Sequence, residues 1–180
     1  VGEDHGLLRL EILSAFIDRA TVDEIARAFS AAGFLAVIME PRALSLTRLL
    51  RERSMTIGID VDKSYIFVGI DSSGIDFLIV RRGQLYFEYF TPWRDVMDER
   101  GEVSPSIFEA TVIRNLHQVV NFYGQHWTEP IFEVVLSATA LRDEAKKTIS
   151  LNFQFPVHEL ALADPSISSE WFIAVGCGLR

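Results

Sequence analysis

Two short polar turns carry the residues of this sequence that could do chemistry. Asp71-Ser72-Ser73-Gly74 separates two apolar runs, and Ser137-Ala138-Thr139-Ala140 follows a third. The Asp71 carboxylate suits a hard cation and could hold a magnesium-bound water. Ser72 and Ser137 could be nucleophiles, but neither lies in a Gly-x-Ser-x-Gly elbow and no histidine is close in sequence. We therefore interpret both serines as turn residues.

Three acidic residues suggest a second kind of site. Asp71 ends a predicted strand, Glu109 lies on the next predicted helix, and Asp143 follows the next strand. If they converge, they could hold the two divalent ions of a metal nuclease of the ribonuclease-H type. A net charge of −8 and the lack of a basic groove argue against a nucleic-acid substrate. We interpret Glu109 and Asp143 as solvated helix residues.

The Asp71 turn must be positioned by the strands around it. The runs 65–70, 77–80 and 85–90 are rich in β-branched and aromatic residues, and short turns of polar residues and glycine separate them. They predict a meander of three antiparallel strands. In the first run both alternating faces are apolar, so we expect that strand to be covered on both sides.

The rest of the chain alternates helical and strand patterns. A Thr21 N-cap with Glu24 three residues later predicts a helix that Gly33 ends. Another helix starts at Pro41, and a long one starts after Ser104 and ends at Gly124. The remaining predictions are strands at 7–13, 34–39, 131–136 and 156–160, a polar loop at 91–106, and helices at 141–149 and from Trp171 onward.

The order of these elements defines a fold class. Residues 54–64 show weak periodicity and form the best candidate boundary, after which the order is β-β-β-α-β-α-β-α. That order predicts an α/β protein with a ribonuclease-H-like mixed sheet and flanking helices, preceded by a small βαβα segment. We expect residues 1–53 and 54–180 to form separate parts.

Composition sets the broad class of the protein. Of 180 residues, 49% are hydrophobic, which is ample for a core, and no apolar stretch is long enough to span a bilayer. The single Cys177 fits a reducing compartment, and the four histidines show no zinc-ligand spacing. No signal peptide is visible, and because the sequence does not begin with Met we expect it to be part of a longer chain.

Several local motifs occur in an order and spacing that resemble the PilM family of actin-like proteins of type IV pilus assembly, and more distantly FtsA. The resemblance covers most of the chain. The motifs are Ala31–Phe34, Met39–Leu44, Val68–Gly74, Arg81–Leu85, Asn121–Tyr123, Val134–Ser137 and Trp171–Arg180.

This resemblance implies the actin-like ATPase fold and a nucleotide site. Asp71, Ser72, Ser73 and Gly74 would take the place of the family's second phosphate hairpin, with Asp71 as a magnesium residue. Ser137, Ala138 and Thr139 would take the place of its adenosine-binding turn. Residues 1–53 would be the remnant of the family's small inserted subdomain with a connecting helix.

The chain departs from the family at the positions that would bind nucleotide. An acid and a glycine are exchanged, giving Gly69 and Asp71, and the adenosine turn has lost its glycines. Trp93 and Arg94 replace two expected glycines. We therefore expect a scaffold with a degenerate site and no bound cofactor, whereas ATP and magnesium would be cofactors if the site is intact.

The resemblance also implies partners and a location. The first hypothesis is a non-catalytic adaptor on the cytoplasmic side of a type IV pilus or related secretion platform, at the periphery of the inner membrane. It would bind the tail of a PilN-like membrane protein and could self-associate, without nucleic acid. The alternatives are a working ATPase of the same machinery and the metal nuclease.

Overall fold

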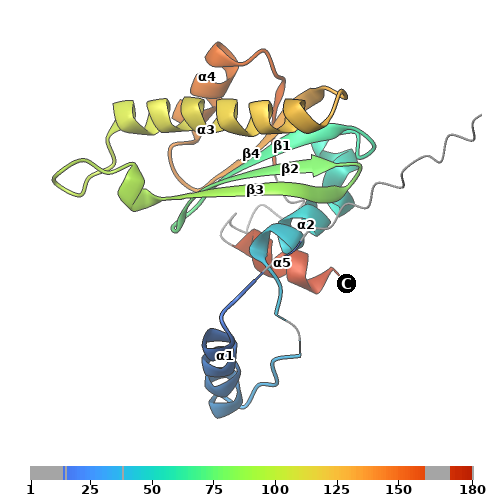
Figure 1. Ribbon diagram of the computed structural model, residues 1–180, viewed down its shortest axis with the longest axis vertical. Coiled ribbons are helices and arrows are strands. Elements are labelled where there is room, and N and C mark those ends of the chain that lie inside the picture. Colours follow the sequence, from blue (N-terminus) through green and yellow to red (C-terminus); the bar gives the residue numbers. More distant parts are fainter. Residues whose placement is uncertain (1–13, 15, 38, 161–170, 180) are drawn as a thin grey trace, which may run out of the picture. The chain divides into compact units, whose positions relative to one another are not determined.

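The computed structural model describes residues 14, 16–37, 39–160 and 171–179 (Figure 1). The chain divides into two compact units between Pro41 and Arg42. The expected boundary after residue 53 therefore falls inside helix α2 (Arg42–Ile57), which packs with the second unit. No helix in the described ranges is long and apolar enough to cross a membrane.

The first unit contains helix α1 (Arg19–Ala31). Its N-cap is Asp18 rather than the expected Thr21, because the Asp18 carboxylate accepts a hydrogen bond from the Thr21 backbone N–H at 3.4 Å. Gly33 has φ +81° and follows the helix end, as expected. The strand expected at 34–39 is absent from its described residues, which form no ladder, and the strand expected at 7–13 lies outside the described residues.

The second unit is built on a five-stranded sheet whose spatial order is β3-β2-β1-β4-β5. The first three strands form the predicted antiparallel meander, and β4 and β5 pair in parallel beyond β1. The mixed sheet and the order of elements after the boundary are therefore as predicted. The strands are β1 (Ser64–Ile70), β2 (Gly74–Arg81), β3 (Gln84–Pro92), β4 (Ile131–Ala138) and β5 (Val157–Glu159).

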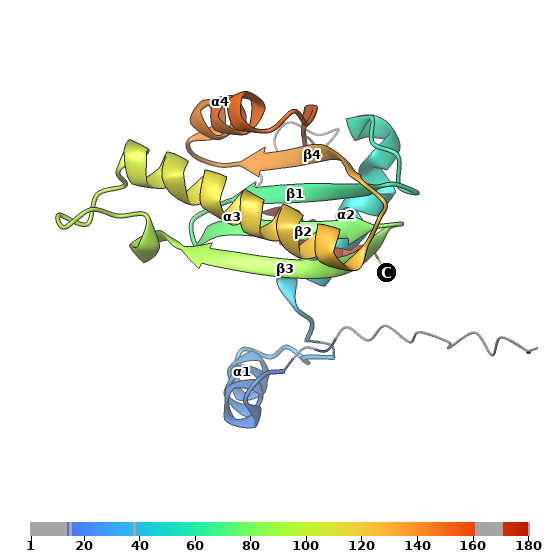
Figure 2. The same ribbon diagram turned by 45° about the horizontal axis from the view of Figure 1, so that its top comes forward.

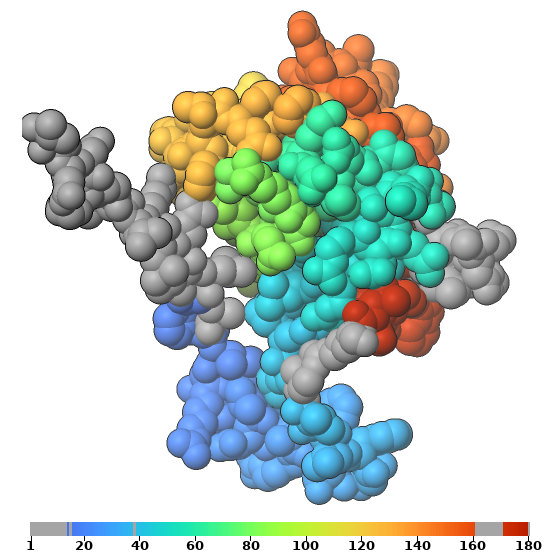
Figure 3. Space-filling model, turned by 90° about the vertical axis from the view of Figure 1, so that its right-hand side faces the viewer, coloured from blue at the N-terminus to red at the C-terminus, as the bar shows by residue number. Residues whose placement is uncertain are grey.

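Helices cover both faces of this sheet (Figure 2). On one face, α3 (Pro105–His126) and α4 (Arg142–Asn152) pack on alternate residues of β1 such as Ile66 and Val68. On the other face, α2 and α5 (Phe172–Gly178) pack on Tyr65 and Phe67. Figure 3 shows the red surface of α5 directly against the cyan surface of α2. The expectation that β1 is covered on both sides is confirmed.

Several boundaries differ from the sequence predictions. Helix α3 passes through Gly124 to His126, because glycine accepts helical angles and Tyr123 and Trp127 hold this end by packing around Tyr86. The expected loop after residue 90 is shorter, since β3 continues to Pro92 and a 3₁₀ turn (Trp93–Asp95) follows. Trp171 is the N-cap of α5 rather than part of the helix.

Candidate functional site

The Asp71 turn is held together by its own side chains. The Asp71 Oδ1 atom accepts hydrogen bonds from the Ser73 backbone N–H at 2.7 Å and from the Ser73 hydroxyl at 2.5 Å, and the Asp71 N–H donates to the Gly74 carbonyl. This is the local bonding for which Asp and Ser are favoured in turns. Gly74 is required because a Cβ there would lie 2.3 Å from the Thr91 carbonyl oxygen. Ser72 is exposed to solvent and makes none of these bonds.

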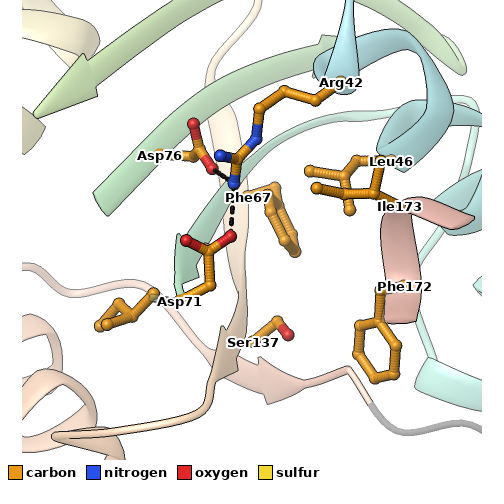
Figure 4. A pocket seen from close by; sticks show the side chains of 10 residues that line it. Arg42, Leu46, Phe67, Asp71, Asp76, Ser137, Phe172 and Ile173 are labelled. Carbon is orange, nitrogen blue, oxygen red and sulfur yellow. Dashed lines mark hydrogen bonds and ion pairs between the residues drawn. The ribbon is translucent and has the colours of Figure 1, made fainter. Parts of the chain in front are cut away.

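Arg42, the first residue of α2, occupies the space beside this turn. One guanidinium nitrogen, Nη2, binds the Asp71 carboxylate at 2.6 Å and also binds the Asp76 carboxylate. The other nitrogen, Nη1, donates to the Ser73 hydroxyl at 2.7 Å. Figure 4 shows the Arg42 side chain reaching between the two carboxylates. A single internal cation thus bridges the hairpin and β2.

The two carboxylates have opposite electrostatic environments. Burial would raise the pKa of Asp71, but the hydrogen bonds from Ser73 and the charge of Arg42 outweigh it and lower the pKa. Asp76 is only 1% exposed, and burial raises its pKa to about 7 in spite of the opposing charge of Arg42. The negative charges of Asp71 and Glu88 raise the Asp76 pKa further. Asp71 is therefore the firmly ionised partner of Arg42.

The raised pKa of Asp76 predicts a pH dependence of stability. The folded pKa of about 7 lies above the ordinary value of 3.8, so the folded state binds this proton more tightly than the unfolded state. The stability from this group is therefore full below about pH 4 and is lost as the pH rises to about 7. Urea unfolding should show the Asp76-dependent part of the free energy of unfolding to be about 3 kcal/mol lower at pH 8 than at pH 5.

Asp76→Asn should remove this difference, because asparagine does not ionise. Asp71→Asn is the matched control: the Asp71 pKa is lowered, so its own contribution is lost only on acidification. The slope between pH 5 and pH 8 should persist in this variant, in reduced form, because losing the Asp71 charge lowers the Asp76 pKa. An unchanged slope in Asp76→Asn would contradict the assignment to Asp76.

The second turn lies next to the first, because β1 and β4 are parallel and end at the same edge of the sheet. Ser137 is buried opposite Gly69, and Thr139 extends the ladder by donating its backbone N–H to the Ile70 carbonyl at 2.9 Å. The Ala138 carbonyl accepts a hydrogen bond from Arg142 at 3.0 Å. Two backbone groups of this turn, the Thr139 N–H and the Ala138 carbonyl, are therefore already bonded within the fold.

A small cavity of about 20 Å³ lies between these two turns. That volume suits about one water molecule and is far below the several hundred Å³ of usual ligand pockets. Gly69 lines the cavity. A Cβ at this position would lie 2.8 Å from the Phe67 ring, so the absence of a side chain at Gly69 leaves room for that ring. The remaining lining residues are Arg42, Leu46, Phe67, Ile70, Asp71, Asp76, Ser137, Phe172 and Ile173.

Trp93, which stands where the sequence resemblance implies a glycine, also helps to fix the Asp71 turn. Trp93 donates its indole N–H to the Asp71 backbone carbonyl at 2.7 Å. The hairpin is thus fixed by Ser73, Arg42 and Trp93 together. Two of these three contacts come from outside the meander's first turn, and neither was expected from the sequence.

The carboxylates of the nuclease hypothesis do not gather. Glu109 and Asp143 are both exposed on their helices, α3 and α4. Within the described ranges, no group of three His, Cys, Asp or Glu side chains has the geometry to hold a metal ion. The Asp71 and Asp76 carboxylates instead share the Arg42 guanidinium.

Arg42 and Asp76 are the residues that the sequence reasoning missed. Two signals could have pointed to them. Asp76 interrupts an apolar strand, where a lone charge requires a partner. Arg42 begins a helix, where the helix dipole disfavours a cation unless acidic groups lie nearby.

Comparison with known proteins finds similar structures but no similar sequence. No family model matches the sequence, and no curated protein matches it significantly. One similar structure is a chain of a PilM–PilN type IV pilus biogenesis complex, with a TM-score of 0.63 and 14% identity over 88% of this chain. Another is the ethanolamine utilization protein EutJ from Carboxydothermus hydrogenoformans, with a TM-score of 0.57 and 14% identity over 91% of this chain.

This chain spans 57% of the PilM–PilN chain and 62% of EutJ, so it corresponds to less than two thirds of either. At 14% identity, these matches show a likeness of fold alone. The predicted ribonuclease-H-like sheet and its helices match these structures over most of the chain. The chain therefore has a PilM-like, actin-like fold, as the sequence resemblance implied.

Proposed function

We propose that this chain belongs to a non-catalytic actin-like scaffold on the cytoplasmic side of a type IV pilus or related secretion platform. It would lie at the periphery of the inner membrane and bind the tail of a PilN-like membrane protein. The structural likeness to the PilM–PilN complex supports this choice of machinery and partner. Self-association remains part of the proposal.

One observation carries the non-catalytic part: the Arg42 guanidinium fills the place beside the Asp71 turn. A magnesium ion there would have to displace an arginine that has three partners, among them a carboxylate that is almost fully buried. Two of the backbone N–H groups that would face a phosphate are also engaged, since the Ser73 N–H donates to the Asp71 carboxylate and the Asp71 N–H donates to the Gly74 carbonyl. Groups of the chain itself thus already bind the positions that a magnesium ion and a phosphate would take.

The alternative is a working ATPase of the same machinery, with Asp71, Ser72, Ser73 and Gly74 at the phosphates and Ser137, Ala138 and Thr139 near the adenosine. One observation favours it: the two turns lie at the same edge of the sheet. ATP and magnesium would then be the cofactors, and Arg42 would have to move away. No cluster of carboxylates in the described part of the chain favours the nuclease.

Calorimetry with ATP and magnesium distinguishes the two. The intact protein should give no binding heat at millimolar ATP, because the site is filled from within. Micromolar affinity would overturn the scaffold and favour the ATPase. The sharpest control is Asp71→Ala: if wild-type ATP binding is observed and this change abolishes it, the ATP lies at the Asp71 turn.

A further inference from the structure

The outer edge of β3 is an open template for another strand. In the sheet order β3 is terminal, and within the described ranges it pairs only with β2. It has nine residues, whereas the strand at the opposite edge, β5, has three. Figure 2 shows β3 running along the border of the sheet. Among the described residues of the second unit, its outward backbone N–H and C=O groups join no ladder, so they can pair with an added strand.

Most of this edge lacks the features that usually protect an edge strand. The register is regular from Phe87 to Pro92, and its one irregularity lies earlier, between Leu85 and Phe87. Proline occurs only at the last position, and the strand contains no lysine. Soluble proteins commonly protect long edges with lysines, central prolines or bulges. The stretch Phe87–Thr91 therefore presents about five regular residues for pairing.

Aromatic side chains fix this stretch in place and frame it. Phe87 stacks on Phe122 of α3 with a centroid distance of 4.4 Å, and Tyr89 lies beside Phe77. Tyr89 and Phe90 nevertheless remain 39% and 40% exposed. Large rings that are rigid and partly exposed are the side chains enriched at binding hot spots.

Glu88 sets the charge of the edge. It stands opposite Leu78 on β2, so its cross-strand neighbour supplies no positive charge. Partial burial raises its pKa, opposed by the charge of Arg42. Arg42 itself is engaged by Asp71, Ser73 and Asp76. A basic residue on an added strand would complement this carboxylate.

The negative charge of Glu88 also indicates which partner would pair with this edge, a second copy of the chain or a segment of another protein. A second copy of this chain would bring another Glu88 to the edge and would add its own net charge of −8. We propose that β3 binds an extended segment of another protein, with a Lys or Arg opposite Glu88 between apolar residues, by adding it as a sixth strand. The inference rests on the proposed scaffold role and specifies where and how a tail would bind.

The test uses a designed probe, the fluorescein-labelled peptide Thr-Val-Thr-Lys-Thr-Val-Thr, and its twin with a central Glu. By fluorescence anisotropy the intact protein should bind the Lys peptide about five-fold more tightly than the Glu peptide. Glu88→Lys should reverse this preference, and Glu88→Gln should abolish it. Glu109→Gln, which changes an exposed acid on α3, should keep it.

Backbone pairing gives the second readout. The Lys peptide should slow hydrogen exchange within residues 84–92, and the same peptide N-methylated at alternate residues should neither bind nor protect. Equal binding of the methylated peptide, an absent charge preference, or no binding at millimolar peptide would each overturn the proposal. Protection that appears without peptide as the protein dimerises would overturn it in favour of a second copy.

These outcomes are separable from the nucleotide test. A protein that binds neither ATP nor peptide keeps the proposed scaffold role but loses this docking edge. A protein that binds ATP with micromolar affinity loses the scaffold role, while its charge-dependent peptide binding would still establish the edge.

Discussion

Replacing Arg42 with alanine should lower the free energy of unfolding by about 2 kcal/mol at pH 8, because the Asp76 carboxyl, whose pKa is about 7 in the wild type, must then either take up a proton or stay charged without its partner. The change leaves Asp76, which is 1% exposed, without the cation that pairs with it, and removes a bond to Asp71 and one to Ser73. At pH 5 the loss should fall to about 1 kcal/mol, because Asp76 is then protonated and only the partly exposed Asp71 pair is lost. Urea unfolding at both pH values measures the difference.

Two further variants isolate the cause of that loss. Asp76→Asn combined with Arg42→Ala should recover most of the extra loss at pH 8, because the buried charge is then absent. Arg42→Lys should be intermediate, since an ammonium cannot reproduce the three contacts of the planar guanidinium. A loss that is equal at both pH values would show that Asp76 does not carry the effect.

The position of Arg42 also explains why the sequence could predict the sheet but only part of the site. The meander follows from short-range patterns: the alternating faces of residues 65–70 fit a strand covered on both sides, and that is how β1 packs. The nearness of the two turns follows from β1 and β4 being parallel. Asp71 and Ser73 were found because they build a local turn.

The rest of the site depends on a pairing over long sequence distance. Arg42 and Asp76 are 34 positions apart and come from different elements, so no local period links them. The pair forms because a buried carboxylate and a cation at a helix start each require a partner. Trp93 likewise reaches the hairpin from 22 positions away. The sequence alone could indicate that a buried carboxylate and a cation at a helix start need partners, but only the folded structure shows which residues those partners are.

Misplaced boundaries in the first unit have a local cause. Asp18 and Thr21 are both good N-caps, and the capping-box pattern favoured Thr21. The structure uses the earlier residue, which adds three residues to the helix. The apolar run at 34–39 resembles a strand by composition, yet a strand requires a partner, and none of its described residues joins a ladder.

A single methyl group at Gly176 should destabilise the protein by about 3 kcal/mol, at the upper end of the usual cost of overpacking. Gly176 is buried where α5 crosses α2, and a Cβ there would lie 2.1 Å from the Ser45 carbonyl oxygen and 2.6 Å from its carbon. Both obstacles are backbone atoms inside α2, so no side-chain rotation relieves the overlap. Urea unfolding of Gly176→Ala against the wild type measures the cost.

Gly178→Ala is the matched control in the same helix, because its added Cβ would meet no described atom within 4 Å apart from its chain neighbours and the backbone of its own helix. There alanine should be neutral or stabilise by up to about 1 kcal/mol, since glycine is the weaker helix former. Equal stability of the two variants would show that α5 does not depend on this close approach. A loss of stability in Gly176→Ala, together with no loss in Gly178→Ala, would show that it does. The Arg48 side chain, which donates to the Gly176 carbonyl at 2.8 Å, then reinforces a crossing that only glycine permits.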